Sequence, residues 1–428
     1  MNAAAGRAFR FGRRQTLGLL FGLLGLFLVG YVAPNLDQMD RGLSLEPPPD
    51  PAKLIVDPTV TVTAIGVLFV LAAVATFFER RSSRLAGGAL LVSTVLFIPL
   101  VVVLALALSE TRNTNVMQLL VESLRLGTPV ALGAMAGLWC ERAGVVNIGI
   151  EGMMLTSAGT GFMAYAVLGD ANTPWALWAA VLVALATGGL IGLLHALLSV
   201  TFRVDQIISG VVINLLALGL TGFLRSEVIV GTGVSTGVPT GTIALPLLSD
   251  IPIVGPQLFT NKPIFFAMFA VIAGTSWVLF RTPFGLRVRS VGENPHAAET
   301  LGIDPIRIRY RAVVIGGVIA GLAGAWFSLE SQAGFQDNMT NGTGFIALAA
   351  LIFGKWRPGT AFAGAILFGF TRALGARLQI LQVSVGDFSI PSEFLQSLPY
   401  VVTIIVVAGA VGRAIAPAAD GVPYERSR

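Results

Sequence analysis

The sequence predicts an all-α, polytopic integral membrane protein, a helical bundle of about 10–12 transmembrane segments with broken or re-entrant helices. The first observation is a mean hydropathy of +0.80 with 54% hydrophobic residues. The second is that 12% of the residues are charged, where soluble domains carry about 25%. The third is that the basic residues gather in short loops between long apolar runs. These observations exclude an ordinary soluble domain.

The basic balance of the chain, with a pI of about 9.8, does not indicate nucleic acid. Basic residues in short loops beside membrane spans instead mark the cytoplasmic side. The single cysteine, Cys140, excludes an internal disulfide, and no set of cysteines and histidines has the spacing of a metal site. We therefore expect no nucleic-acid partner, no metal and no cofactor.

The N-terminal region begins with four arginines that precede an apolar run near 16–33. A signal peptide has the same order, but its apolar core holds roughly 7–15 residues. This run has about 18, so we expect an uncleaved first span that starts on the inside. The proline-rich segment 34–58 follows as a stiff outer loop without a core.

Eleven further apolar runs have spanning or half-spanning length, at about 20 residues per crossing. Most of the 28 lysines and arginines lie in the loops that this count places inside, and both termini are then cytoplasmic. Lys355-Trp-Arg-Pro358 separates two of the runs, which predicts one broken helix pair or a re-entrant hairpin. The runs lie near 59–78, 86–108, 117–140, 145–168, 175–200, 207–224, 263–280, 312–330, 343–356, 358–376 and 397–415.

The longest charged interruption of the apolar pattern is Arg281–Arg311, with six arginines and three acids. Such a basic loop stays in the cytoplasm and orients the chain. Within it, Pro295 can start a helix that Gly302 ends, so we expect a short ordered helix over Pro295–Leu301. It is either a docking element or a connector that is solvated only to set the topology.

A second polar stretch, Glu141–Gly152, is rich in glycine and holds Asn147 and Glu151. These two residues share one face if the helix continues, whereas the glycines favour a broken helix beside a polar path. A carboxylate inside a span costs about 2.5–3.5 kcal/mol and usually lines a cavity or pairs. Glu151 therefore either faces a path or pairs with Arg125 or Arg142 and stabilises packing.

Two other polar side chains lie within apolar runs. Asn214 is expected to form an interhelical hydrogen bond, with a role in the path as the alternative. His195 is expected to be a packed, hydrogen-bonded residue rather than a proton relay. The small-residue ridge from Gly317 to Gly324 is expected to serve helix packing.

The sequence does not favour an enzyme. It contains no phosphate-binding GxxxxGK[ST], no nucleophile elbow and no HExxH zinc motif. The nearest fragment, Gly354-Lys355-Trp356, lacks the preceding glycine and the hydroxyl. The chain therefore does not hydrolyse ATP by the P-loop route.

Four stretches in order resemble the permease subunits of bacterial ABC importers for nucleosides and simple sugars, a group related to ribose-type and branched-chain amino acid permeases. The resemblance covers roughly Gln118–Ala414, and the ERAGVVNIGIEG form is most similar to the nucleoside branch. The stretches are Glu141–Met154, Gln206–Leu218, Thr282–Arg287 with Gly292–Ala298, and Gly354–Gly369.

The resemblance implies a function and a set of partners. The chain would form the solute path of an ATP-driven importer and couple to a separate ATPase subunit. Its other partners would be a second, different permease, an extracytoplasmic solute-binding protein and the lipid bilayer of the inner membrane. Nucleosides are the first choice of solute, then simple sugars, then branched-chain amino acids.

The resemblance also implies roles for residues. The coupling helix would use Gly292, Glu293, Asn294, Pro295 and Ala298 to dock into the ATPase. The substrate path would be lined by Asn147, Glu151 and Asn214.

The resemblance further implies a division of the chain. Residues 1–115 would be additional N-terminal spans with the proline-rich loop, 116–416 the permease domain and 417–428 a cytoplasmic tail.

Two other classes remain open from the residues alone. An ion-coupled secondary transporter would titrate Glu151 as a proton or sodium relay. A membrane scaffold that transports nothing is disfavoured by Asn147, Glu151 and Asn214, which are polar residues within apolar runs. Dependence on ATP or on an ion gradient separates the first class from an ABC importer.

Overall fold

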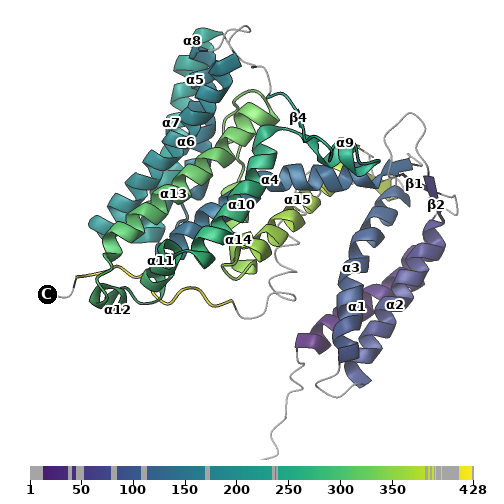
Figure 1. Cartoon of the computed structure of the whole chain (residues 1–428). Helices are drawn as coiled ribbons and strands as arrows, with labels where there is room; N and C mark the ends of the chain where they lie inside the picture. The colour runs from purple at the N-terminus through teal and green to yellow at the C-terminus, as the bar shows by residue number, and fades with distance from the viewer. Residues whose placement is uncertain are drawn as a thin grey trace, which may run out of the picture. The chain divides into compact units, whose positions relative to one another are not determined.

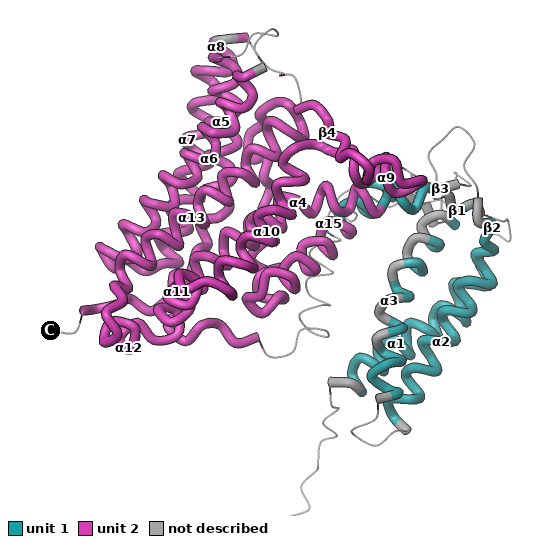
Figure 2. The backbone as a smooth tube through the Cα atoms, viewed as in Figure 1, with its two compact units in different colours: residues 1–119, 372–412 teal, residues 120–371, 413–428 magenta. Residues whose placement is uncertain are grey.

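The computed structural model shows a helical membrane protein in two compact units (Figures 1 and 2). Unit 1 comprises residues 1–119 and 372–412, and unit 2 comprises residues 120–371 and 413–428. The structure describes residues 13–36, 41–44, 53–78, 84–107, 113–168, 174–233, 237, 240–380, 384–385, 388–389, 391, 397 and 414–426.

In the described part of residues 1–119, unit 1 has three long antiparallel helices: α1 Arg13–Phe27, α2 Pro58–Phe78 and α3 Arg84–Ala107. Phe69 and Leu100 are among the buried side chains of its core. Strand β1 Arg41–Ser44 pairs antiparallel with β2 Lys53–Val56 and parallel with β3 Asn113–Asn115. The segment predicted as a stiff loop therefore holds two short strands, which its proline content did not indicate.

Unit 2 is built from long helices that bury one another's apolar faces. Short helices α11, α12 and the C-terminal segment lie at one end of it, and α8 lies at the other (Figure 1). The long elements are α4 Val116–Glu141, α5 Ile150–Leu168, α6 Pro174–Ala196 with η3 Leu197–Thr201, α7 Gln206–Leu224 with η4 Arg225–Ile229 and α8 Val230–Thr232, α10 Pro263–Arg281, α13 Pro305–Ala325 with η5 Trp326–Ser331, and α15 Pro358–Ile380.

Within the described residues, eight helical segments are long and apolar enough to cross a membrane. Helix α14 Thr343–Phe353, with 11 residues, is shorter, and a turn joins it to α15. Of the two alternatives for 343–376, the structure shows a helical hairpin, because a Cβ on Gly364 of α15 would lie 3.5 Å from the Ala350 Cβ of α14. Most of the run near 397–415 lies outside the described residues.

The remaining elements are short strands and helices. Between α7 and α10, strand β4 Ile243–Ala244 pairs with β5 Thr260–Asn261 around the short helix α9 Val254–Leu258. Helix α11 Pro283–Glu293 and helix α12 Pro295–Thr300 follow α10. In unit 1, β6 Ser384–Val385 pairs with β7 Phe388–Ser389.

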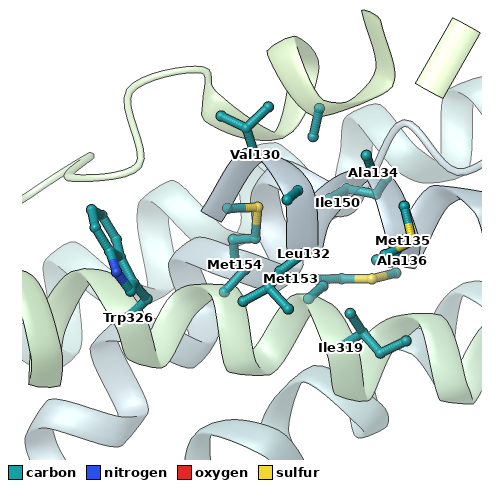
Figure 3. Packing of buried hydrophobic residues seen from close by; sticks show 14 of the residues in the cluster. Val130, Leu132, Ala134, Met135, Ala136, Ile150, Met153, Met154, Ile319 and Trp326 are labelled. Atoms are coloured by element: carbon teal, nitrogen blue, oxygen red, sulfur yellow. The ribbon is translucent and has the colours of Figure 1, made fainter. Parts of the chain in front are cut away.

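The core of unit 2 lies where α4, α5 and α13 meet. Figure 3 shows Met153 and Met154 of α5 beside Ile319 of α13 and Trp326. The ridge predicted for packing is confirmed, because a Cβ on Gly317 would lie 2.3 Å from the Gly188 carbonyl oxygen of α6. A Cβ on Gly321 would lie 2.5 Å from the Ala184 carbonyl oxygen. The lack of side chains at these glycines thus lets the backbones of α6 and α13 approach closely.

Gly321→Ala should separate α6 from α13, because the added methyl group meets backbone rather than a movable side chain. We expect a loss of about 1–3 kcal/mol and a fall of several degrees in the Tm of the purified chain. Gly219→Ala on α7 is the control, since its Cβ meets no atom within 4 Å. Equal Tm values for the two variants would contradict this packing.

Candidate functional site

The α4–α5 loop, residues 142–149, interrupts the helix at the glycine-rich stretch. Helix α4 ends at Glu141, α5 begins at Ile150, and Gly144 has a φ of +81°. The run predicted at 145–168 was therefore wrong in its first five residues. The condition under which Asn147 and Glu151 would share a helix face is not met, because Asn147 lies in the loop.

Side chains from two other helices hold the middle of this loop. The Val146 N–H donates to Gln206 Oε1 over 2.6 Å, and the Val146 carbonyl oxygen is 3.0 Å from His195 Nε2. His195 Nδ1 is 3.0 Å from Ser209 Oγ. The expectation of a packed, hydrogen-bonded His195 is confirmed, and it ties α6 and α7 to the loop.

Asn214 of α7 holds the point where the loop enters α5. Its Nδ2 donates to the Ile148 carbonyl oxygen over 3.1 Å, and the Gly152 N–H donates to its Oδ1 over 2.8 Å. The expected interhelical hydrogen bond is thus confirmed. A Cβ on Gly152 would lie 2.8 Å from the Ile213 carbonyl oxygen, so glycine is needed for this approach.

Asn147 is fully buried and has weak partners. Its Nδ2 lies 3.3 Å from Cys140 Sγ and 3.6 Å from Met153 Sδ. Its Oδ1 has no hydrogen-bond partner among the described residues. A buried amide oxygen without a donor is uncommon, because leaving it unpaired costs about 1–3 kcal/mol.

The Glu151 carboxylate binds the start of α14. Oε1 accepts hydrogen bonds from Thr340 Oγ1 at 2.6 Å and the Gly342 N–H at 2.8 Å, and Oε2 accepts from the Gly344 N–H at 2.5 Å. A carboxylate at a helix N-terminus is stabilised by the unsatisfied N–H groups there. These three hydrogen bonds, two of them from backbone N–H groups, therefore offset the free-energy cost of burying the Glu151 carboxylate.

The two arginines considered as partners of Glu151 bond elsewhere in the described chain. Arg142 Nε and Nη2 donate to the Trp356 carbonyl oxygen over 3.0 and 2.6 Å. Arg125 Nε donates to Asn261 Oδ1 over 2.7 Å. The ion pair weighed for Glu151 is not recorded within the described residues.

A second buried carboxylate, Glu330, was not singled out from the sequence. It accepts hydrogen bonds from the Ile264 N–H at 2.6 Å and the Phe265 N–H at 3.1 Å, in the first turn of α10. Lys262 Nζ donates to the Glu330 carbonyl oxygen. The only local signal is an acidic residue at the end of an apolar run.

The predicted helix in the basic loop is confirmed as α12, and Gly302 after it has a φ of +79°. Each helix here starts with a proline after a side-chain cap. Thr282 accepts from the Gly285 N–H, Asn294 from the Ala297 N–H and Asp304 from the Arg307 N–H. This repeated pattern fixes the α11–α12–α13 corner.

The five coupling residues divide by exposure. Glu293 and Asn294 are exposed, whereas Gly292, Pro295 and Ala298 are buried against the protein. A Cβ on Gly292 would lie 2.2 Å from the Arg142 carbonyl oxygen, so α11 touches the start of the α4–α5 loop. The outward side of α12 is formed by other residues: His296, Ala297, Thr300 and Leu301.

The C-terminal segment, residues 414–426, packs on this corner. The Ala419 N–H donates to the Gly292 carbonyl oxygen over 2.9 Å, and the Ala418 N–H donates to Glu293 Oε2 over 3.2 Å. Arg426 pairs with Glu299 at 3.1 Å. The tail is therefore part of the corner rather than a free end in this stretch.

Arg309, one of the six arginines of the basic loop, is buried and links three segments. Its Nε donates to the Ala143 carbonyl oxygen over 3.2 Å and its Nη1 to the Val422 carbonyl oxygen over 3.0 Å. It therefore fastens the α4–α5 loop and the tail to α13. The sequence analysis counted it among the arginines of the basic loop and assigned it no structural role.

No metal site is evident in the described residues, where no three His, Cys, Asp or Glu side chains are grouped. The polar groups of the site bind backbone instead. The arrangement can hold a broken segment of backbone inside a helical bundle and connect it to a surface corner. Ser209 and His195 lie within hydrogen-bond distance, but both side chains are buried and His195 Nε2 faces the Val146 carbonyl oxygen, so this pair serves packing rather than catalysis.

Comparisons with known proteins agree with the resemblance in the motifs. A guanosine ABC transporter permease protein of Bacillus subtilis is 40% identical over 312 residues, 72% of this chain and 96% of that protein. A nucleoside ABC transporter permease protein of Lactococcus lactis is 39% identical, covering 73% and 99%. A putative glucose ABC transporter permease protein of Haloferax volcanii is 34% identical, covering 69% and 92%.

No solved structure matches the chain. The relatives are named as ABC transporter permeases, which does not favour the ion-coupled alternative. The family model described as the permease component of branched-chain amino acid transport systems matches residues 119–415, more than half of the chain. The chain therefore belongs to this permease family and is a multi-pass membrane subunit of an ABC transporter rather than an enzyme.

Proposed function

We propose that this permease carries nucleosides into the cell, with both of its termini on the cytoplasmic side of the inner membrane. The observation that carries the proposal is the 40% identity to a guanosine permease over 96% of that protein's length. The ERAGVVNIGIEG stretch supports the same branch. The relative named for glucose, at 34%, makes sugars the second choice.

The experiment is uptake of labelled guanosine by vesicles that contain the complete transporter. We expect ATP-dependent uptake that other nucleosides compete for and that glucose and leucine leave unchanged. If glucose competed with uptake and other nucleosides did not, sugars rather than nucleosides would be the substrate class.

As an ABC transporter permease, the chain works with an ATPase and a solute-binding protein. We infer in addition that it pairs with a second, different permease. Two proteins of Bacillus subtilis named as guanosine ABC transporter permeases match this chain, at 40% and 28% identity. The two permeases of that organism differ in their similarity to this chain, which supports a transporter built from two unlike permease subunits. This chain resembles the first of the two more.

We propose further that residues 1–115 are an addition to the permease domain, 116–416. The family match begins at residue 119 and ends at 415, which supports this division. The tail, 417–428, would lie on the cytoplasmic side with α12.

The α4–α5 loop is proposed to lie beside the solute path, with Asn147, Glu151 and Asn214 as its polar residues. Irregular backbone at membrane depth is tolerated only where protein buries it or it lines a cavity. Because Glu151 and Asn214 are occupied by backbone groups, we assign them to positioning the loop. Asn147 Oδ1 has no partner in the described part of the chain and its side chain is buried here, so we propose that Asn147 meets the solute only when the permease opens at this loop.

We also propose that α12 docks into the ATPase. The five residues Gly292, Glu293, Asn294, Pro295 and Ala298 then shape and seat the helix rather than supply most of its outer surface. The exposed residues His296, Ala297, Thr300 and Leu301 would meet the ATPase. Motion would reach the α4–α5 loop through the contact between Gly292 and Arg142 and through Arg309.

Glu151→Gln should weaken the start of α14, because it replaces one carboxylate oxygen with an amide NH2 group. This group cannot accept the hydrogen bond that the Gly342 or Gly344 N–H donates to the carboxylate. We expect a loss of roughly 1–3 kcal/mol in stability and reduced uptake that still requires ATP. Thr340→Val, which removes one donor, should act in the same direction. Uptake that a protonophore abolishes while ATP is present would instead support Glu151 as a proton relay.

Leu301→Asp should weaken ATPase binding, because Leu301 is 79% exposed on the proposed docking face. We expect at least a tenfold loss in co-purified ATPase, about 1.4 kcal/mol, with normal amounts of the permease in the membrane. Leu247→Asp is the matched control, since Leu247 is 84% exposed in the segment between β4 and α9. Unchanged ATPase binding in Leu301→Asp would remove α12 from the interface.

Asp420→Asn should reduce the pH dependence of stability. Burial raises the pKa of Asp420 to about 7, and Arg309 offsets part of that rise. An unfolded aspartate has a pKa of about 3.9, so ionisation favours the unfolded state as pH rises from about 4 towards 7. The Tm of the wild-type chain should therefore fall more than that of Asp420→Asn between pH 5 and pH 8. Equal falls would contradict a buried, protonated Asp420.

A further inference from the structure

A cavity of about 540 Å³ opens at the turn between α14 and α15, a volume within the range of ligand pockets. Three basic side chains line it: Arg142, Lys355 and Arg357. Apolar side chains, Phe353 and Ile415, line another part. All of these residues belong to unit 2, and none of the proposed transport steps uses the cavity.

The cavity carries an excess of positive charge. No acidic side chain is among its described lining residues. Lys355 and Arg357 are exposed, and neither has a recorded ion pair within the described chain. Burial lowers the pKa of Arg142; Glu293 raises it, and Arg289 and Arg357 lower it. Burial and two neighbouring cations thus disfavour the positive charge on Arg142, which a bound anion would relieve.

The acids closest to these cations are engaged with other groups. Glu141 Oε2 accepts a hydrogen bond from Trp356 Nε1. Glu293 Oε2 accepts one from the Ala418 N–H at 3.2 Å. Neither acid is among the lining residues, so the basic side of the cavity stays available to an external anion.

The basic residues stand on a fixed turn. Lys355 and Trp356 have φ values of 51° and 52°, and the Trp356 carbonyl oxygen is held by two hydrogen bonds from Arg142. Trp356 is buried, so the two exposed cations lie on either side of an anchored residue. The backbone that presents the two cations is therefore already ordered, and only their side chains remain to be immobilised when an anion binds.

The cavity lies where the chain enters the membrane. Helix α15, a candidate span, begins at Pro358, directly after Arg357. Ile415 of the lining is 74% exposed and Ile352 beside Phe353 is 43% exposed. Basic pockets between membrane helices bind the headgroups of acidic lipids. A soluble phosphate would make no use of the apolar side.

We propose that this cavity binds the headgroup of an anionic phospholipid, with its phosphate against Arg142, Lys355 and Arg357 and its acyl chains towards Phe353 and Ile415. The same Arg142 contacts Gly292 through its carbonyl oxygen, so an occupied site would brace the start of the α4–α5 loop. The binding claim is independent of which solute the permease carries.

The experiment measures lipid binding to the purified full chain by native mass spectrometry and by the Tm shift that added lipid produces. The ligands are phosphatidylglycerol, phosphatidylcholine and inorganic phosphate. We expect phosphatidylglycerol to bind and raise the Tm, phosphatidylcholine to do so far less, and inorganic phosphate to have little effect at the same concentration.

The double variant Lys355→Gln/Arg357→Gln should lower the affinity for phosphatidylglycerol by about tenfold or more. Both positions are exposed, so the fold should be kept. The charge-matched control is Arg287→Gln/Arg311→Gln, which removes two exposed cations outside the cavity lining and should leave the affinity unchanged. Ile415→Asn should weaken phosphatidylglycerol binding and leave any phosphate binding as it is.

Three results would overturn the proposal. In the first, the double variant and its control bind phosphatidylglycerol as tightly as the wild type. In the second, inorganic phosphate raises the Tm as much as the lipid does, which would assign the site to a soluble anion. In the third, the double variant loses the ATPase in co-purification and keeps the lipid, which would assign the surface to the ATPase.

Discussion

The irregular backbone between α4 and α5 must find its hydrogen-bond partners inside the bundle, because it is largely buried in protein. Three helices provide them, so the shape of the loop depends on all three being packed at once. The same loop begins at Arg142, whose carbonyl oxygen touches Gly292 of α11. A displacement of the corner would therefore reach the loop directly. The side chains that hold the loop are His195 of α6, Gln206 and Asn214 of α7, and Arg309 of α13.

Two of the buried glutamates, Glu151 and Glu330, follow the same rule at helix starts. Glu151 accepts from backbone N–H groups before and within α14, and Glu330 does so in α10. Each carboxylate supplies acceptors to donors that the first turn of a helix leaves unsatisfied. Their hydrogen bonds thus stabilise the bundle, which accords with an importer driven by ATP rather than by ion binding at Glu151.

Hydropathy and helix caps predicted the elements whose formation depends on residues close together in sequence. Most of the spans and α12 with its Gly302 end follow from local pattern, as does the packing ridge at Gly317. The glycines of 141–152 favoured a broken helix there, but the extent of the loop, 142–149, could not be predicted, because its partners lie on helices distant in sequence and its apolar residues read as a span. The burial of Arg309 could not be predicted either, because its acceptors, the carbonyl oxygens of Ala143 and Val422, are more than 100 positions away in sequence.

The most direct test of the account is hydrogen exchange across residues 142–152 in the purified full chain. If side chains hold this loop, the amides of Val146 and Gly152 exchange about as slowly as those within α4 and α5. Exchange of these two amides at the rate of an exposed loop, while the interiors of α4 and α5 remain protected, would contradict it.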